Sequence, residues 1–271
     1  MPEITVFVND YPESSPQWRS GMREGFTSAQ LYKRLPYGTT VPSHCPNLPA
    51  ISFDLRVDPD WIEQNLANTP FTPVGDRIFI SASDYSNNAV VPFKDIIVIV
   101  PMEYKGKRGG HPIVEFENLN RLVMGGREKW GYPKLVSDIS FDRLDNGGVR
   151  SVVKLGSTPV VELEWTPDDT VTQADPLQLT PHYLLRLLPD ASREGMGFAE
   201  VLNRDTSSDV TLLEKKIGKG SVKFNKWPQY ELDYCDLADL EIKEIVSATF
   251  TTSDWHATEE NGWARLVDRI L

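Results

Sequence analysis

Short strand patterns separated by turn residues recur along the chain from residue 51 onward, and they constrain its fold more than any other feature. Residues 51–57 alternate apolar and polar side chains, as a half-buried strand does. Similar patterns follow at 77–84, 94–104, 111–117, 136–141, 148–156 and 159–166. Short turns such as Asn146–Gly147 separate several of them, which indicates antiparallel pairing. The sequence therefore predicts an α+β fold with a mostly antiparallel β-barrel core, closed or nearly closed, and a few flanking helices.

The glycines and cations at 105–111 lie between two strand patterns and predict a hairpin turn rather than a phosphate-binding loop.

The last third of the chain continues the strand pattern with fewer clear turns. Further on, the patterns predict a strand at 180–190 (a helix is the alternative), a loop at 190–208, a hairpin at 208–227 around Gly218–Gly220, a long strand at 241–255 and a closing helix at 258–271.

Two helical segments are expected in the first half of the chain. Residues 58–66 begin with Asp58 as a cap and Pro59 in the first turn, a combination typical of a helix start. A second helix precedes Pro133, which removes a hydrogen-bond donor and favours a helix end near Gly131. The expected cap is Asn118, and the expected apolar face consists of Leu119, Leu122, Val123 and Trp130.

The N-terminal part lacks this regularity. The sequence predicts one domain over 1–271, in which 1–50 form an irregular arm and 51–271 form the barrel with its helices. Within the arm, an edge strand is expected at 4–8, a short helix at 27–34 with Thr27 as its cap, and an extended proline-rich segment at 35–49. Such an arm either wraps a neighbouring subunit of a homo-oligomer or forms a partly ordered tail.

Composition and charge exclude several classes of partner. The net charge of −11 and the pI of about 4.9 disfavour nucleic acid and anionic membranes as partners. The longest apolar run, residues 96–102, has the length of a strand and not of a membrane helix. The N-terminus has no basic region followed by an apolar core, so no secretory signal is expected. With two cysteines far apart in sequence, a reducing cytoplasmic location is predicted.

The stretch GREKWGYPK, residues 126–134, contains the main candidate for chemistry. Lys134 follows the expected helix end and begins the next strand, where its side chain could enter a cavity. A lysine acts as a nucleophile when its amine is neutral, and burial or a neighbouring cation lowers its pKa. Trp130, Tyr132 and Leu135 would supply apolar surroundings, and Arg127 a cation. The alternative is an ordinary solvated lysine.

These residues resemble the lysine motif of the acetoacetate decarboxylase superfamily. The motif reads Gly-Arg-Glu, a short spacer, an aromatic residue and Pro-Lys. Residues 240–250, LEIKEIVSATF, resemble a late strand of that family, and residues 101–106, PMEYKG, lie at the family's distance from the motif. The resemblance covers about residues 48–271. It implies a barrel fold in which Lys134 reaches inside and forms a Schiff base with a ketone.

The resemblance also assigns roles to other positions. Counting back from Lys134 without gaps, a family glutamate falls on Asp95, which would move protons. A family arginine falls on Leu48, a second glutamate on Ile80, and the second family lysine on Leu135. Without the arginine, the pocket is less suited to a substrate carboxylate than that of the decarboxylase. Superfamily members that catalyse aldol, dehydration or cyclisation reactions on keto compounds are therefore at least as similar.

The leading hypothesis is a lyase that forms a Schiff base through Lys134 with a keto acid or related small carbonyl compound. Decarboxylation of a β-keto acid is the first alternative, and a non-covalent cyclase or small-molecule-binding barrel the second. Arg127 would hold the amine or a substrate carboxylate in place, unless it forms a structural ion pair with Glu128. Tyr132 is either a wall of the pocket or an acid, and Tyr85 is a weaker candidate acid. Trp130, Leu135 and Ile80 complete the expected substrate site.

No cofactor or metal is expected from the sequence. The four histidines, His44, His111, His182 and His256, share no metal-ligand spacing, and His44 beside Cys45 is an isolated pair. The chain contains neither a nucleophile elbow nor a dinucleotide-binding glycine motif.

Overall fold

The computed structural model describes residues 31–37, 41–172, 174–227 and 237–271. The chain divides into two compact units, Met1–Thr39 and Thr40–Leu271. In the first unit, the described residues 31–37 form short helical turns. The strand expected at 4–8, most of the helix expected at 27–34 and its cap Thr27 lie outside the described residues.

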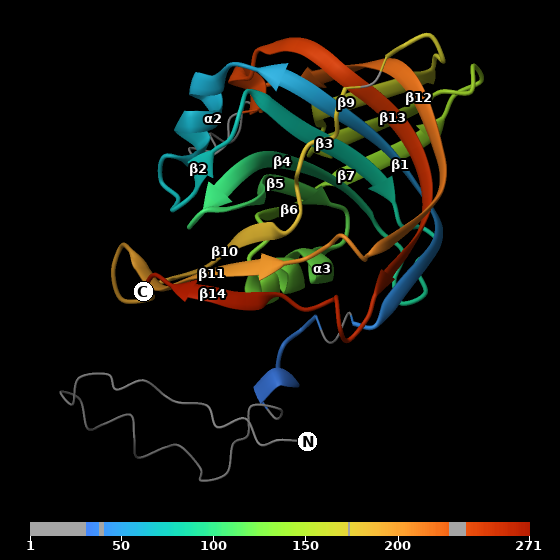
Figure 1. Cartoon of the computed structure of the whole chain (residues 1–271). Coiled ribbons are helices and arrows are strands. Elements are labelled where there is room, and N and C mark those ends of the chain that lie inside the picture. Colours follow the sequence, from blue (N-terminus) through green and yellow to red (C-terminus); the bar gives the residue numbers. More distant parts are fainter. Residues whose placement is uncertain (1–30, 38–40, 173, 228–236) are drawn as a thin grey trace, which may run out of the picture. The chain divides into compact units, whose positions relative to one another are not determined.

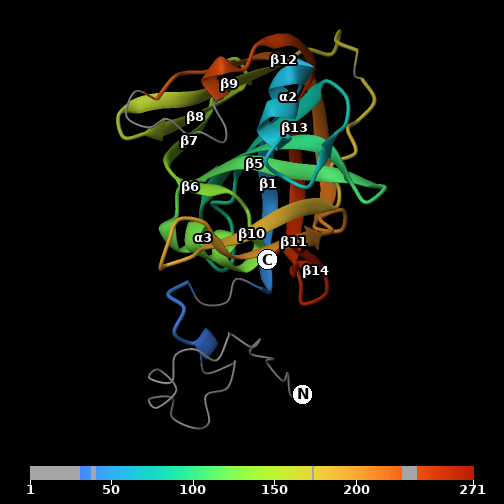
Figure 2. The same cartoon turned by 90° about the vertical axis from the view of Figure 1, so that its left-hand side faces the viewer.

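The second unit is built around one strongly curved sheet (Figures 1 and 2). Its strands are β1 (Ser43–Val57), β2 (Thr72–Pro73), β3 (Arg77–Asp84), β4 (Lys94–Tyr104), β5 (Lys107–Glu117), β6 (Lys134–Val136), β7 (Asp138–Arg143), β8 (Val149–Leu155), β9 (Thr158–Pro167), β10 (His182–Pro189), β11 (Met196–Arg204), β12 (Val210–Phe224), β13 (Ile242–Ala257) and β14 (Arg265–Arg269). The helical elements are α2 (Pro59–Leu66), α3 (Asn120–Gly125), the π-helical turn η2 (Gly126–Trp130) and the 3-10 turn η3 (Leu237–Asp239).

The strands follow the order β14-β11-β10-β5-β4-β3-β1-β13-β12-β9-β8-β7, with β2 on β4 and β6 on β5. Most neighbours are antiparallel, whereas β5 runs parallel to β6 and to β10. The sheet curls until β7 packs against β3, β4 and β5. The predicted α+β fold with a mostly antiparallel sheet is confirmed. The closure expected of a barrel is not found, because among the described strands β7 and β14 remain unpaired edges.

Alternation along the central strands gives the sheet an apolar face and a polar face. On the apolar face, Ile51, Phe53 and Leu55 of β1 are fully buried. They belong to one core with side chains from β8 and β9, at the other end of the curled sheet: Val149, Val153, Val161, Leu163 and Trp165. Burying each large apolar side chain contributes about 1.5–3 kcal/mol, so this core stabilises the curl. The opposite face carries polar side chains of the same strands, such as Ser52 of β1 and Ser81 of β3.

Several local predictions are confirmed. Helix α2 begins after Asp58, whose side chain accepts a hydrogen bond of 3.1 Å from the Asp60 backbone N–H. The hairpin between β4 and β5 turns at Lys105 and Gly106, which have φ angles of 49° and 75°. Strand β10 lies within the predicted 180–190 strand.

In the described part of the chain, no helix is long and apolar enough to cross a membrane.

Three predictions in the last third of the second unit are wrong. The expected closing helix is instead strand β14, because it pairs along β11. The expected loop at 190–208 contains β11 itself, which joins β10 to β14. The expected hairpin at 208–227 is one continuous strand, β12, which pairs first with β13 and then with β9. In each case pairing with a strand distant in sequence overrides the local pattern.

The glycines that suggested a hairpin allow close packing instead. A Cβ at Gly218 would lie 2.2 Å from the Thr166 carbonyl oxygen, and one at Gly220 would lie 2.0 Å from that of Glu164. Glycine in a strand often marks such an approach of a neighbouring backbone. Strand β1 begins at Ser43, so the segment 43–50, expected in the arm, belongs to this strand.

A buried histidine on β5 leads to a prediction on acid stability. His111 lies among apolar side chains, and its Nδ1 is 2.8 Å from the Tyr183 carbonyl oxygen. Burial lowers the pKa of His111 from 6.5 to about 4. The unfolded chain therefore binds this proton first as the pH falls. We expect the free energy of unfolding to drop by about 3 kcal/mol from this group between pH 6.5 and 4.

Urea unfolding of the wild type and of His111→Gln, at several pH values from 4 to 8, tests this expectation. The variant should lack this part of the acid destabilisation, so that the difference between the two proteins shrinks as the pH falls. Curves that stay parallel over the whole range would show that His111 does not titrate as expected.

Candidate active site

Lys134 is positioned by a helix end and by a parallel strand pair. The predicted helix extends from α3 through η2 and ends at Gly131, whose φ of 78° is left-handed. A Cβ at Gly131 would lie 2.6 Å from the backbone of Leu185, so glycine is required there. Asn118 does not cap this helix, because its side chain instead accepts a hydrogen bond of 2.8 Å from the Lys94 backbone N–H. Lys134 then starts β6 opposite Glu115 of β5.

The amine of Lys134 lies among carboxyl groups on the polar face of the sheet. Its Nζ is 2.9 Å from Glu115 Oε1 and also bonds Glu117 Oε2. Glu115 and Glu117 alternate on β5 and therefore share a face, and Asp95 of β4 is the cross-strand partner of Glu117. The Lys134 side chain is 13% exposed, and those of Glu115 and Glu117 are 6% and 0% exposed. Lys134, Glu115, Glu117 and Asp95 are called the lysine cluster below.

The charge of the amine differs from the sequence-based expectation. Burial by itself disfavours the ammonium form, but Glu115, Glu117 and Asp95 together outweigh burial and raise the pKa of Lys134. In the free protein the amine is therefore protonated. The apolar surroundings predicted for a neutral amine are replaced by carboxylates, since the strand opposite Lys134 presents glutamates.

Two carboxyl groups of the cluster, those of Glu117 and Asp95, have raised pKa values. Burial raises the pKa of Glu117 from 4.5 to about 7, although Lys134 opposes the rise. Burial, followed by the charge of Glu115, raises the pKa of Asp95 well above its ordinary value. Two like charges about 4 Å apart repel by roughly 4 kcal/mol at an effective dielectric constant of 20. Repulsion from the neighbouring carboxylates therefore adds to burial in favouring the protonated form of Asp95.

A second buried network adjoins the cluster through Tyr132. Its ring centre is 5.8 Å from Lys134 Nζ, and its hydroxyl is 3.0 Å from His182 Nδ1. Arg204 forms a hydrogen bond with Tyr132 and an ion pair with Asp209. Burial, with the charge of Arg204, lowers the pKa of His182 to about 3, so its imidazole is neutral. Burial also raises the pKa of Tyr132, which keeps its phenol protonated.

Tyr85, the weaker candidate acid, lies on the same side of the sheet as the cluster. Burial, followed by the charges of Asp95 and Glu115, raises its pKa well above the ordinary value. Its ring stacks on Phe93 at 4.3 Å and contacts the edge of Trp255. The structure thus brings Tyr85, Tyr132, Asp95 and Lys134 together, as the candidate site requires.

Arg127 and Glu128 lie outside this cluster. Both side chains are exposed. Arg127 Nη1 donates a hydrogen bond of 3.1 Å to the backbone carbonyl of Lys134. It therefore contacts the backbone of β6 and not the amine. Within the described residues no ion pair joins Arg127 to Glu128, so the structural alternative is not found either. Trp130 packs against Trp263 at 6.1 Å, beside the cluster of Tyr132, Leu184 and Leu202.

Leu135 and Ile80 belong to the other face of the sheet. Leu135 lies opposite Phe116 and packs against the apolar core, as expected for a neighbour of Lys134 in a strand. Ile80 is fully buried in the same core, and the adjacent Ser81 takes the polar face, where its Oγ is 2.9 Å from that of Ser52. Leu48, on which the ungapped count from Lys134 places the family arginine, is a buried apolar residue.

Sequence reasoning missed Glu115 and Glu117, which contact the amine directly. A signal was present, since two glutamates two residues apart in the apolar strand HPIVEFE must share one face. It also missed His182 and Arg204, which come from β10 and β11. Those two have no local signal, because their contact with Tyr132 depends on strand pairing.

A separate hollow of about 560 Å³ lies over β7, β8 and β9. Its lining is mostly polar and consists of Asn118, Asp138, Ile139, Ser140, Asp142, Arg150, Val152, Lys154, Pro159 and Glu162. Lys134 and the carboxyl groups around it are not part of this lining, so the hollow is distinct from the lysine cluster.

Gly126 gives the Lys134 side chain its room. A Cβ at Gly126 would lie 2.5 Å from Lys134 Cδ and 2.6 Å from Cε. Gly126→Ala should therefore displace the amine while improving the helix propensity by up to about 1 kcal/mol. We expect a folded protein in which the reactivity of Lys134 falls by about 100-fold, the cost of a displacement of about 1 Å.

The rate at which a small carbonyl compound labels Lys134, trapped with borohydride and followed by peptide mass spectrometry, measures this effect. Gly197→Ala is the matched control, because a Cβ there would lie 3.4 Å from its nearest neighbour, an ordinary contact. Equal labelling rates in Gly126→Ala and wild type would show that the packing against Gly126 does not position the amine.

The fold and the lysine cluster together define a class of protein with a curved sheet and a buried lysine held among carboxyl groups. A sequence model described as acetoacetate decarboxylase (ADC) matches residues 34–264. The chain belongs to the acetoacetate decarboxylase family.

Curated relatives are similar at low identity. "Acetoacetate decarboxylase 1" of Bradyrhizobium diazoefficiens is 26% identical over 164 residues, which are 58% of this chain and 60% of that protein. "Decarboxylase DEC1" of Cochliobolus heterostrophus is 25% identical over 212 residues, 76% of this chain and 81% of that protein. The chain thus spans about 60% of the length of the first of these relatives.

Solved structures share the fold. The acetoacetate decarboxylase of Legionella pneumophila has a TM-score of 0.69 and 18% identity, covering 84% of this chain and 88% of that one. The enduracididine biosynthesis enzyme MppR, solved with pyruvate, has a TM-score of 0.64 and 18% identity, covering 85% and 91%. At these identities the likeness concerns the fold.

Proposed function

We propose that this protein is a lyase that forms a Schiff base between Lys134 and a keto acid or related small carbonyl compound. The observation that carries the proposal is the position of Lys134 Nζ, buried and bonded to Glu115 and Glu117 with Asp95 beside them. A buried ammonium with adjacent proton acceptors can become a neutral amine without exchanging its proton with bulk water. Membership of the acetoacetate decarboxylase family supports this reading.

The first step transfers a proton within the cluster. Glu117 has a pKa of about 7, so a substantial fraction is ionised at neutral pH and can accept a proton from the Lys134 ammonium. Protonation of Glu117 removes one of the charges that raise the pKa of Lys134, which favours the neutral amine. The free amine then attacks the carbonyl carbon and forms a carbinolamine.

The second step requires an acid. The raised pKa of Asp95 favours its protonated form, so Asp95 is suited to protonate the carbinolamine hydroxyl, which leaves as water. The lone pair of nitrogen forms the iminium, and Asp95 becomes a carboxylate. The iminium then accepts the electron pair released when a bond at the adjacent carbon breaks.

One oxygen of Glu115 and one of Glu117 lack a hydrogen-bond partner within the described residues, and these oxygens could accept a hydrogen bond from a substrate hydroxyl.

Aldolase, dehydratase or cyclase chemistry is the first choice for the bond that breaks or forms. The lysine cluster contains three carboxyl groups and one amine, and the ungapped count from Lys134 puts the apolar Leu48 where the family has its arginine. Such a site does not attract a substrate carboxylate toward the iminium. A neutral carbonyl compound, or a keto acid whose carboxylate lies away from the cluster, fits this charge distribution better.

Decarboxylation of a β-keto acid is the second candidate. It is favoured by the relatives named acetoacetate decarboxylase. Release of carbon dioxide from acetoacetate at a rate that depends on Lys134 would identify it, and the absence of release together with imine formation would favour the first choice.

Trapping with borohydride tests the proposal directly. The protein is incubated with pyruvate, acetoacetate or a neutral methyl ketone, then reduced, digested and analysed by mass spectrometry. We expect a mass increase on the peptide that contains Lys134, corresponding to the reduced imine. If none of the carbonyl compounds leaves an adduct on Lys134, a non-covalent cyclase or a small-molecule-binding protein becomes the better reading.

We also propose a homo-oligomer in a reducing, cytoplasmic environment, acting on a small molecule and not on nucleic acid or a membrane. Exposed apolar side chains along β14, Leu266 and Val267, and the following Ile270 support an interface with a second copy. Light scattering of the purified protein tests the oligomer. A monomer at all concentrations would contradict it.

A further inference from the structure

We propose that His44, Asp254 and His256 form a binding site for a divalent transition-metal ion. The site is outside the lysine cluster and plays no part in the imine chemistry. His44 and His256 are 212 positions apart in the sequence, and the pairing of β1 with β13 brings them together.

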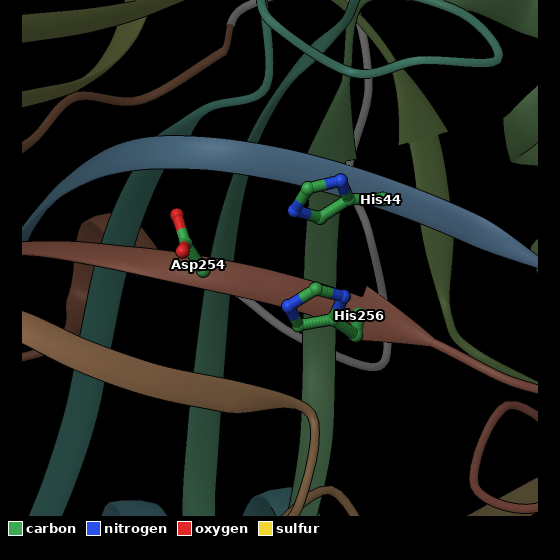
Figure 3. A group of neighbouring side chains, drawn as sticks. All are labelled: His44, Asp254 and His256. Carbon is green, nitrogen blue, oxygen red and sulfur yellow. The ribbon is translucent and has the colours of Figure 1, made fainter.

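Strand register brings the three side chains together. His44 on β1 and His256 on β13 are direct cross-strand partners, and Asp254 lies two residues before His256 on the same face. The candidate ligand atoms all lie within 4.8 Å of one another. The imidazole rings stack at 4.2 Å between centres and 6° between planes. Figure 3 shows the rings on neighbouring strands, with the Asp254 carboxylate beside them.

The cluster of His44, Asp254 and His256 lies on the opposite side of the sheet from the lysine cluster, as the neighbouring residues in the sequence show. Cys45 and Trp255, which follow His44 and precede His256, point to the other side of the sheet. There Trp255 contacts Tyr85 at 5.4 Å between ring centres, next to the lysine cluster. The two clusters therefore lie on opposite faces of the sheet.

An unsatisfied polar atom indicates that a partner belongs at this position. His44 Nε2 is buried and has no hydrogen-bond partner within the described residues. Buried polar atoms without a partner are rare in native proteins and call for an explanation such as a bound ion. Asp254 accepts a hydrogen bond of 2.9 Å from the Asn47 backbone N–H through Oδ1, and its other oxygen remains available for a cation.

The backbone around the cluster is held firmly. The His44 carbonyl accepts a hydrogen bond of 2.8 Å from Ala89, and the His256 N–H donates one of 2.7 Å to Asp209. Ligands fixed on strands lose little freedom when an ion binds, which favours affinity. Side-chain rotation alone must then close the remaining gap. Bonds of about 2.0–2.1 Å in a tetrahedral zinc site separate the ligand atoms by about 3.3 Å.

The donor set determines the class of ion. Two imidazoles and one carboxylate suit zinc, copper, nickel and iron, whereas calcium and magnesium prefer oxygen ligands. Three protein ligands leave at least one position for water. An ion bound there would join the start of β1 to the end of β13. Its binding would raise the free energy of unfolding, and the rise would be larger the tighter the ion binds.

Zinc binding by the chelator-treated full chain tests the site. Isothermal titration with Zn²⁺ should give one ion per chain with a dissociation constant of about 10 µM or tighter. The expected rise in Tm at saturating zinc is about 5 °C. The substitutions His44→Gln, His256→Gln and Asp254→Asn should each abolish this rise, or weaken binding by at least about 10-fold.

Matched variants keep the result interpretable. Asp254→Asn retains an oxygen that can accept the Asn47 bond, so its loss of zinc binding would reflect the charge and not the fold. Asp169→Asn, an exposed acid elsewhere in the chain, should bind zinc like the wild type. The proposal is overturned if the wild type binds no zinc at 100 µM, or if all three cluster variants bind it as the wild type does. Because binding is measured without a carbonyl substrate, a failed borohydride experiment would not affect this result.

Discussion

Replacing Lys134 with alanine should abolish imine formation and lower kcat/KM by at least roughly 10⁴-fold, the scale of losing a covalent nucleophile. The next side chain, Leu135, has no amine and packs against the apolar core, and Arg127 donates a hydrogen bond to the backbone carbonyl of Lys134. The measurement is the rate of substrate conversion, together with borohydride trapping in the same preparation.

Lys215→Ala is the control for this experiment, since Lys215 is an exposed lysine on β12. It should keep both the rate and the adduct of the wild type. Circular dichroism verifies that both variants are folded. Full activity in folded Lys134→Ala would rule out the covalent mechanism and leave a pocket that acts by shape alone.

Replacing Glu117 with glutamine should lower the rate of imine formation by about 10²–10⁴-fold, the usual contribution of a positioned proton acceptor. Glutamine has a similar shape but cannot take the proton of the Lys134 ammonium, to which Glu117 is bonded. The pH profile distinguishes this role from simple packing. In the wild type the rate should rise as Glu117 ionises through pH 7, because its pKa is raised to about 7.

The glutamine variant should lose that rise around pH 7. Glu241→Gln, at an exposed position, is the control and should keep this rise.

The effect of Glu117 on folding stability has the opposite sign from that of an ordinary ion-paired carboxylate. Since the folded-state pKa of Glu117 is raised, the unfolded state loses this proton first, and the group destabilises the fold as pH rises from 4.5 to 7. Glu117→Gln should therefore be at least as stable as the wild type at pH 8, and a pH profile unchanged from the wild type would contradict the proposed role.

The charge of the amine has a consequence for substrate choice. Because the raised pKa values of Lys134 and Asp95 favour their protonated forms, substrate binding must shift protons within the cluster before an imine can form. A substrate that brings in a carboxylate would raise the pKa of Lys134 further. Neutral ketones should therefore be trapped faster than keto acids of the same size at neutral pH.

Local pattern determined most of the elements. The alternation in 77–84 and 94–104 predicted β3 and β4, and Asp58 with Pro59 predicted the start of α2. The motif at 126–134 identified both the helix end and the reactive lysine candidate. These features depend on residues near in sequence, where side-chain alternation and backbone dihedral preferences act directly.

Long-range pairing decided what the local pattern could not. The segment 258–271 reads as a helix on its own, yet it forms β14 because β11 offers an edge. The acids around Lys134 come from β4 and β5, and the network of Tyr132 from β10 and β11. Ile80 illustrates the limit of counting residues, since a one-residue difference along a strand exchanges the polar face for the core.

The sequence alone thus determined the α+β class, the strand-rich core and the placement of Lys134 after a helix, because each is encoded over a few neighbouring residues. Only the tertiary structure decided that the sheet stays open, that the lysine is charged among carboxyl groups, and that His44 meets His256. The physical reason is that pKa values and ligand sets depend on distances between strands, and those distances are set by register and curvature and not by local pattern.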